Sequence, residues 1–156
     1  MFLMWPLLSI VSVDCGVPIN NGPMHLVAKS ALRALDTWLR IGTPPVLAPR
    51  LEMNDAGSEI ARNADGIALG GIRTPPVDVP VDVLSGAPGP SPAILCLLLG
   101  SSTPLPDTRL AELYPNRAAY QQMYAAATDQ TIKAGYVLDV DRDALVGFSQ
   151  PDRIQP

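Results

Sequence analysis

Apolar residues recur at steps of three and four between Pro23 and Ile41, and they predict one long amphipathic helix. Pro23 suits its first position, where a missing N–H costs nothing, and Asn21 or Gly22 is expected to cap it. Gly42 ends the helix and is soon followed by two prolines. The apolar face consists of Leu26, Val27, Ala31, Ala34, Leu35, Trp38 and Leu39. A face of this size is expected to lie against a large apolar surface.

The pattern after this helix is typical of extended chain. Residues 51–53 suggest a short strand, and Asp65-Gly66 is a typical two-residue hairpin turn. Between residues 77 and 83 valines alternate with polar residues and prolines, which predicts an edge strand or a strap over the surface. Residues 94–99 form a continuous apolar run, and its length predicts a buried strand.

The last third of the chain is predicted to be helical. Asp107 caps one short helix, and Asn116 caps a longer one that reaches Ala134 and stops at Gly135. Asp141 is expected to cap one further helical turn or two. One face of the longer helix is expected to pack inward, and it carries Tyr120, Met123, Tyr124, Ala127 and Thr131.

Composition narrows the class of protein. With 156 residues, 47% of them hydrophobic, the chain is expected to form one globular unit, and its 17 prolines and 12 glycines predict short elements and many turns. The formal charge of −4, with dispersed lysines and arginines, offers no basic stripe for nucleic acid. A single histidine and two cysteines without a CxxC motif supply no zinc ligand set, so neither a metal nor another cofactor is expected.

Residues 1–13 are apolar, but Pro6 interrupts them and they fall short of the roughly 20 residues that a transmembrane helix needs. They also lack the positive start of a secretion signal, so a buried strand or a misassigned start codon is favoured. Cys15 and Cys96 are a candidate disulfide if the protein is exported, and two free buried cysteines otherwise. The compartment, cytoplasmic or secreted, stays open.

Four stretches of sequence occur together: residues 15–23, residues 28–45, residues 64–75 and Leu113-Tyr114-Pro115 before a helix. The most specific run is Gly70-Gly71-Ile72-Arg73-Thr74-Pro75-Pro76-Val77-Asp78-Val79-Pro80. Together they resemble the C-terminal part of the bacterial alpha/beta-hydrolase domain-containing proteins, a largely uncharacterised family. The resemblance spans roughly residues 14–148.

The resemblance implies that this chain is an α+β fragment of an α/β-hydrolase-type fold. It divides the chain into an apolar N-terminal segment that need not belong to the fold (1–13) and the terminal helix region of the hydrolase domain (14–49). A family-specific strap, strand and helices follow (50–150), and then a short tail (151–156).

The resemblance also implies a serine that attacks an ester or amide carbonyl, with an acid and a histidine following it in the chain. No G-x-S-x-G occurs in this sequence, and Gly100-Ser101-Ser102 lacks the trailing glycine. The nucleophile elbow and most of the parallel sheet would lie upstream of Met1. His25, the only histidine, is a weak catalytic candidate, because the helix N-terminus disfavours its cationic form and a surface or packing role is commoner.

Four residues are assigned structural roles. Gly70 and Gly71 allow a close approach of two backbones, and Arg73 beside them is expected to bind a carboxylate or carbonyl oxygens rather than a substrate. Trp38 is expected to pack within the apolar helix face. The acidic run at residues 139–143 lacks the glycine and glutamate of a calcium loop, so calcium is rejected.

Two functions of different class follow. The preferred one is a partial hydrolase-family protein that is inactive alone, with either the missing hydrolase core or a second copy of itself as the partner of its apolar helix face. The alternative is a free-standing small α+β binding or interaction module, exported and cross-linked by its two cysteines. Whether the chain is an enzyme stays open at this point.

Overall fold

The structure, a computed structural model, describes residues 14–156. The predictions made for residues 1–13 lie outside this described part. The elements are α1 (Met24–Ile41), α2 (Pro75–Asp78), β1 (Asp82–Ser85), α3 (Ile94–Leu98), β2 (Ser101–Pro104), α4 (Asp107–Leu113), α5 (Arg117–Lys133) and α6 (Arg142–Val146), with 3-10 helices η1 (Asp139–Asp141) and η2 (Pro151–Arg153).

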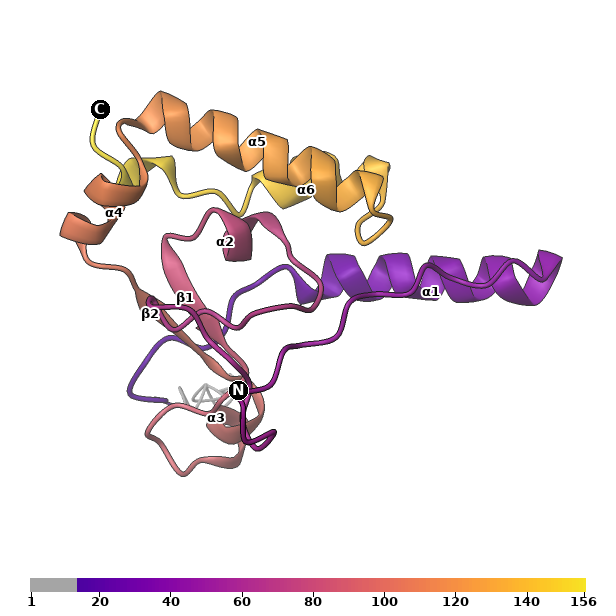
Figure 1. Ribbon diagram of the computed structural model, residues 1–156, viewed down its shortest axis with the longest axis horizontal. Helices are drawn as coiled ribbons and strands as arrows, with labels where there is room; N and C mark the ends of the chain where they lie inside the picture. Colours follow the sequence, from indigo (N-terminus) through magenta and orange to yellow (C-terminus); the bar gives the residue numbers. More distant parts are fainter. Residues whose placement is uncertain (1–13) are drawn as a thin grey trace, which may run out of the picture.

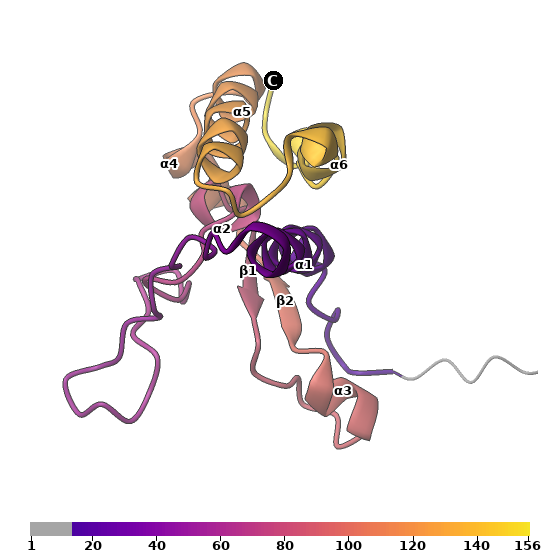
Figure 2. The same cartoon turned by 90° about the vertical axis from the view of Figure 1, so that its right-hand side faces the viewer.

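The helices and the hairpin form two regions (Figure 1). α5 and α6 lie side by side at the top of the molecule, and the β1–β2 hairpin extends away from them toward α3. α1 projects to one side, and Figure 2 shows it end-on between the helical layer and the hairpin. Within residues 14–156 the arrangement is α+β.

The sheet of the described chain has two antiparallel strands, with Val83 opposite Thr103 and Leu84 opposite Ser102. Gly100 leads into β2 with a φ of 63°. A Cβ atom at this position would lie 2.2 Å from the carbonyl oxygen of Ser85, so only glycine fits between the two strands. Residues 14–156 contain no parallel pair of strands.

The main core surrounds α5. Tyr120 is fully buried, and its ring centroid lies 5.0 Å from that of Tyr114 and 5.8 Å from that of Tyr124. Tyr114 donates a hydrogen bond to the carbonyl oxygen of Pro80 and Tyr124 donates one to that of Leu145, and burial raises the pKa of both hydroxyls above the ordinary value. The other buried members are Val79, Val81, Leu105, Leu110, Ala127 and Ile154.

A second, smaller core holds the start of α1. Leu26 packs with Val137 and Leu145, which lie after α5 and in α6. The hydroxyl of Ser30 donates to the carbonyl oxygen of Gly135 at 2.8 Å, and Lys29 lies 2.6 Å from a carboxylate oxygen of Asp141. These contacts fix the first two turns of α1 against the helical layer.

The two long helices agree with the sequence pattern. α1 begins at Met24 and ends at Ile41, and its C-cap Gly42 adopts the left-handed conformation and donates its N–H to the carbonyl oxygen of Trp38. Pro23 occupies the N-cap rather than the first helical position, so the expected caps at residues 21 and 22 are wrong. Asn116 caps α5 as predicted, because its side chain accepts a hydrogen bond from the N–H of Ala119 at 2.9 Å.

The other predicted caps and one face residue differ in detail. Asp107 is the first residue of α4, and Pro106 holds the N-cap. Asp141 precedes α6, but its side chain makes no capping hydrogen bond and pairs with Lys29 instead. Met123, expected on the inward face of α5, is exposed. The Asp141 carboxylate binds Lys29 in place of the capping N–H. Lys29 lies 112 positions away in the sequence, so a local pattern does not reveal this pair.

The predicted buried strand at residues 94–99 is wrong. This run forms the short helix α3, in which Cys96 is buried while Ile94 and Leu98 are 71% and 73% exposed. An unbroken apolar run does not distinguish a helix from a strand, and no neighbouring strand of the described chain pairs with it.

The predicted strap over residues 77–83 is only partly present. Pro75 and Pro76 begin the short helix α2, because proline suits the first positions of a helix, and pairing starts only at Asp82. Residues 51 and 53 make single bridges rather than a strand. The predicted turn at Asp65-Gly66 has three residues rather than two, with Gly66 in the left-handed conformation.

The second core generates a stability prediction. Leu145→Ala removes a fully buried side chain beside Leu26 and should lower the free energy of unfolding by about 2–5 kcal/mol, as measured by urea denaturation. Val140→Ala is the matched control, because this residue is 80% exposed, and should change stability by less than about 0.5 kcal/mol. Equal effects of the two substitutions would contradict the assignment of this core.

Candidate functional site

His25 lies in the first turn of α1 and is exposed. Its ring centroid is 5.9 Å from that of Phe148, with the planes tilted by 43°. No hydrogen bond or ion pair joins the ring to another residue of the described chain. A catalytic histidine needs an orienting carboxylate and a nucleophile in reach, and residues 14–156 place neither against His25.

The two serines of the Gly100-Ser101-Ser102 run lie in a strand rather than in a strand-to-helix elbow. The hydroxyl of Ser102 is buried, donates to the carbonyl oxygen of Ile19 at 3.0 Å and accepts from the N–H of Asn21 at 3.4 Å. The hydroxyl of Ser101 donates to the carbonyl oxygen of Ala87. Both hydroxyls therefore join segments of this chain, and neither presents a free nucleophile.

The glycine-rich run places two backbones in close contact. Gly70 and Gly71 have φ angles of 69° and 72°, which favour glycine. A Cβ atom on Gly70 would lie 2.4 Å from the carbonyl oxygen of Arg50, and one on Gly71 would lie 2.8 Å from a methyl carbon of Leu51. The run thus closes the long loop between residues 51 and 70.

Arg73 binds groups of its own chain. Its guanidinium pairs with Asp78 and donates to the carbonyl oxygens of Ala68 and Val77, at 3.1 and 3.4 Å. The hydroxyl of Thr131 in α5 lies 3.2 Å from the carbonyl oxygen of Arg73. These contacts join the loop, α2 and α5, and they occupy the side chain that substrate binding would require.

Sequence reasoning missed an ion pair that fixes the loop to α4. Arg109 donates to both carboxylate oxygens of Asp65, at 2.8 and 3.1 Å, and also pairs with Glu112. The hydrogen bond from Arg109 holds the pKa of Asp65 below its ordinary value. The pattern assigned Asp65 to a turn, and nothing local in the sequence marks a partner 44 residues away.

Asp82 fixes the C-terminal tail. Its side chain is only 12% exposed, and it accepts hydrogen bonds from Gln150 at 2.6 Å and from Arg153 at 3.4 Å. The backbone N–H of Gln150 also donates to the hydroxyl of Tyr120. The tail, residues 151–156, is therefore an integral part of the main core.

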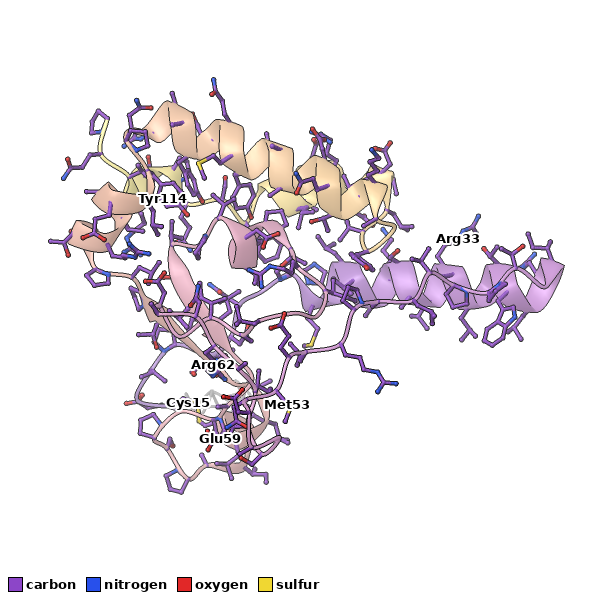
Figure 3. The ribbon with its side chains drawn as sticks, in the orientation of Figure 1. Cys15, Arg33, Met53, Glu59, Arg62 and Tyr114 are labelled. Atoms are coloured by element: carbon purple, nitrogen blue, oxygen red, sulfur yellow. A yellow bond between two sulfur atoms is a disulfide. The ribbon has the colours of Figure 1, made fainter. Side chains whose placement is uncertain are left out.

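The second half of α1 projects from the body of the protein with its apolar residues uncovered, and Figure 3 marks this half by Arg33. Trp38 is 48% exposed and Leu39 is 79% exposed. Between α1 and the returning chain lies an apolar groove of about 360 Å³. Its lining includes Leu35, Trp38, Pro45, Val46, Ile72 and Tyr136.

A disulfide joins Cys15 to Cys96, whose Cα atoms lie 5.4 Å apart and whose sequence separation is 81. Both cysteines are buried. The bond links the start of the described chain to the middle of α3, and Figure 3 labels Cys15 at this end of the molecule.

Among residues 14–156, no group of three His, Cys, Asp or Glu side chains is placed to hold a metal ion. The helices of the same range include none whose length and apolar character would let it cross a membrane.

The Asp65–Arg109 pair generates a pH prediction. Because the pKa of Asp65 is lowered in the folded protein from 3.8, the pair stabilises the fold above this value and loses its effect as the pH falls through the lowered pKa. The free energy of unfolding should therefore be higher for the wild type than for Asp65→Asn at pH 7, with a difference that shrinks below about pH 4.

Urea denaturation at pH 7 and again below about pH 4 measures the difference in unfolding free energy between the wild type and Asp65→Asn. Asp55→Asn is the matched control, since Asp55 is exposed in the same loop and forms no ion pair within the described chain. If the Asp65 and Asp55 variants show the same dependence on pH, the ion pair makes no contribution.

Comparison with known proteins gives one finding. No curated protein and no solved structure matches this chain. A family model described as an alpha/beta hydrolase domain matches residues 6–147, which include α1, the glycine-rich run and the helices through α6. Since this match covers most of the sequence, the chain belongs to the alpha/beta hydrolase domain family.

Proposed function

We propose that this chain forms the C-terminal part of an α/β-hydrolase-type domain and that it does not hydrolyse esters or amides alone. In this proposal residues 14–49 supply the terminal helix of the hydrolase domain. Residues 50–150 form a cap built from the loop, the hairpin and the remaining helices. The nucleophile and the parallel sheet come from polypeptide outside this sequence.

The observation that carries the proposal is the uncovered apolar face of α1. The first two turns of the helix pack on the chain's own second core, whereas Leu35, Trp38 and Leu39 further along are exposed. A helix that covers a hydrolase sheet needs such a continuous apolar stripe. An exposed stripe of this kind marks a surface that is covered in the functional assembly.

The chemistry of the described side chains supports the absence of activity. Serine hydrolysis needs a hydroxyl that is free to attack and a histidine that accepts its proton. Ser102 is buried and bonded to two backbone groups, and the ring of His25 lies against that of Phe148. Arg73 is engaged with three groups of its own chain.

The proposal places these residues in supporting roles for the complete enzyme. Arg73, Gly70 and Gly71 hold the loop of residues 51–70 against α2, and Ile72 in the same run lines the groove beside α1.

An ester assay tests the lack of activity. The purified chain should release p-nitrophenol from p-nitrophenyl acetate at the same rate as the His25→Ala variant, because no serine of the described chain has a base beside it. The measurement is absorbance of the released phenolate against a buffer blank. Saturable turnover that disappears in His25→Ala would show that the triad is complete within this chain.

The uncovered stripe predicts self-association of the isolated chain. Size-exclusion chromatography with light scattering should give a mass above that of the monomer, because the apolar face of α1 is covered only when it meets another surface. The double substitution Trp38→Gln and Leu39→Gln should shift the protein toward the monomer. Val140→Gln, at another exposed apolar position, is the control and should leave the mass unchanged.

A compact wild-type monomer at all concentrations would contradict this prediction, and so would equal effects of the stripe and control variants.

One observation favours the second candidate function, an exported free-standing binding module. The disulfide between Cys15 and Cys96 is typical of proteins that fold in an oxidising compartment. The DNA upstream distinguishes the two candidates. A continuous reading frame that encodes G-x-S-x-G supports the hydrolase part, and a stop codon followed by a ribosome-binding site supports the free module.

A further inference from the structure

The end of the β1–β2 hairpin, residues 86–100, lies outside both cores. Figure 1 shows α3, which belongs to this segment, at the far end of the hairpin, away from α5 and α6. Neither core cluster contains a residue of this hairpin end or of residues 14–17, which lie against it. Cys15 and Cys96 are the only buried side chains in these two segments, and they are bonded to each other. The disulfide thus stands where an apolar core would otherwise be.

The hairpin end has little structure of its own. Residues 86–93 contain three prolines and two glycines and form neither helix nor strand. α3 has five residues, and helices shorter than about 12 residues are marginal in water unless they pack against something. Apart from Cys96, the side chains of α3 are exposed, so the order of this helix depends on an attachment outside the segment.

Few noncovalent contacts supply this attachment. The N–H of Asn20 donates to the carbonyl oxygen of Leu99 at 3.1 Å, and Val17 lies against Gly89. Residues 83–106 contain no Asp, Glu, Lys or Arg, so they provide no side chain for an ion pair. Single hydrogen bonds and contacts near solvent stabilise weakly, and the disulfide is therefore the principal attachment.

The neighbouring parts of the chain are fixed without the disulfide. The N–H of Ser102 in β2 donates to the carbonyl oxygen of Pro18 at 2.8 Å, and the hydroxyl of the same serine donates to that of Ile19 at 3.0 Å. The N–H of Leu105 donates to the carbonyl oxygen of Val81 at 2.9 Å, and both side chains belong to the main core. Loss of the disulfide is therefore expected to free only the two segments that it joins.

We propose that the Cys15–Cys96 disulfide is a reducible clasp. A dithiol reductant opens the hairpin end, while both cores and the pairing of β1 with β2 stay folded. The hairpin end is thus ordered in oxidising surroundings and mobile in reducing ones. The clasp works in the same way in a hydrolase part and in an exported module, because it is built from this chain alone.

The exchange of thiols begins at Cys15. This residue is 7% exposed and Cys96 has no exposed surface, so a thiolate of the reductant reaches the Sγ atom of Cys15 first. A new S–S bond forms there, the bond to Cys96 breaks, and Cys96 leaves as a thiolate that takes up a proton. The second thiolate of the reductant then attacks the reductant sulfur of the mixed disulfide and releases Cys15, which is protonated in turn. Two electrons and two protons pass to the protein, and the reductant leaves as a cyclic disulfide.

Hydrogen exchange of the full chain tests the proposal. The oxidised protein and the protein reduced with dithiothreitol are compared by mass spectrometry, and alkylation with iodoacetamide confirms that both thiols of the reduced sample are free. After reduction the amides of residues 94–100 should exchange on the order of 100-fold faster, because this segment loses its attachment. The amides of α5 should exchange at an unchanged rate, since this helix belongs to the main core.

Two variants separate the effect of the disulfide from that of its surroundings. Cys15→Ser combined with Cys96→Ser should show the fast exchange of residues 94–100 without reductant, and dithiothreitol should not change it. Leu98→Ala, at an exposed position of α3, should keep the slow exchange when oxidised and the full response when reduced. Circular dichroism verifies the fold of each variant.

Three results would overturn the proposal. Unchanged exchange of residues 94–100 after complete reduction would show that noncovalent contacts hold the hairpin end. An equal acceleration in α5 would show that the disulfide supports the whole fold rather than one end of it. Resistance of the folded protein to dithiothreitol would show that the disulfide is closed to reductants.

Discussion

The burial of Tyr120 in α5 is the contact around which most of the described chain is arranged. Its ring packs between Tyr114 and Tyr124, so α4 and α5 meet on one aromatic cluster. Its hydroxyl accepts the N–H of Gln150, and the side chain of Gln150 in turn binds Asp82 at the start of β1. One side chain thereby connects two helices, the tail and the hairpin. A buried hydroxyl needs a partner, and this requirement fixes where the tail lies.

The extent of the helical layer explains why only the first two turns of α1 are packed against the protein. The helical layer is broad enough to cover Leu26 and Ser30, but it ends near Gly135, where α5 stops. Beyond this point α1 borders an apolar groove, which the returning chain lines together with Ile72 and Tyr136. The helix keeps its conformation there because its hydrogen bonds are internal, although its apolar face is exposed.

Most polar side chains that could take part in catalysis or binding instead connect segments of the chain. Arg73, Arg109 and Asp82 each join segments that are distant in the sequence or in the fold, and Ser102 ties β2 to the chain before α1. This distribution supports the proposal that the reacting groups lie outside this chain. The chain belongs to the alpha/beta hydrolase domain family.

The sequence by itself determined the two long helices, because their signals are local. A regular apolar period, Gly42 as a left-handed stop and Asn116 as a cap act within a few residues of one another. The family could also be identified from the sequence, since the glycine-rich run is a contiguous motif. Tertiary structure alone decided that residues 94–98 form a helix, that Asp65 pairs with Arg109 and that Asp82 holds the tail. Each of these depends on a partner, or on the lack of one, at a distant place in the chain. A local pattern carries no information about such partners, because they become neighbours only when the core around Tyr120 has formed.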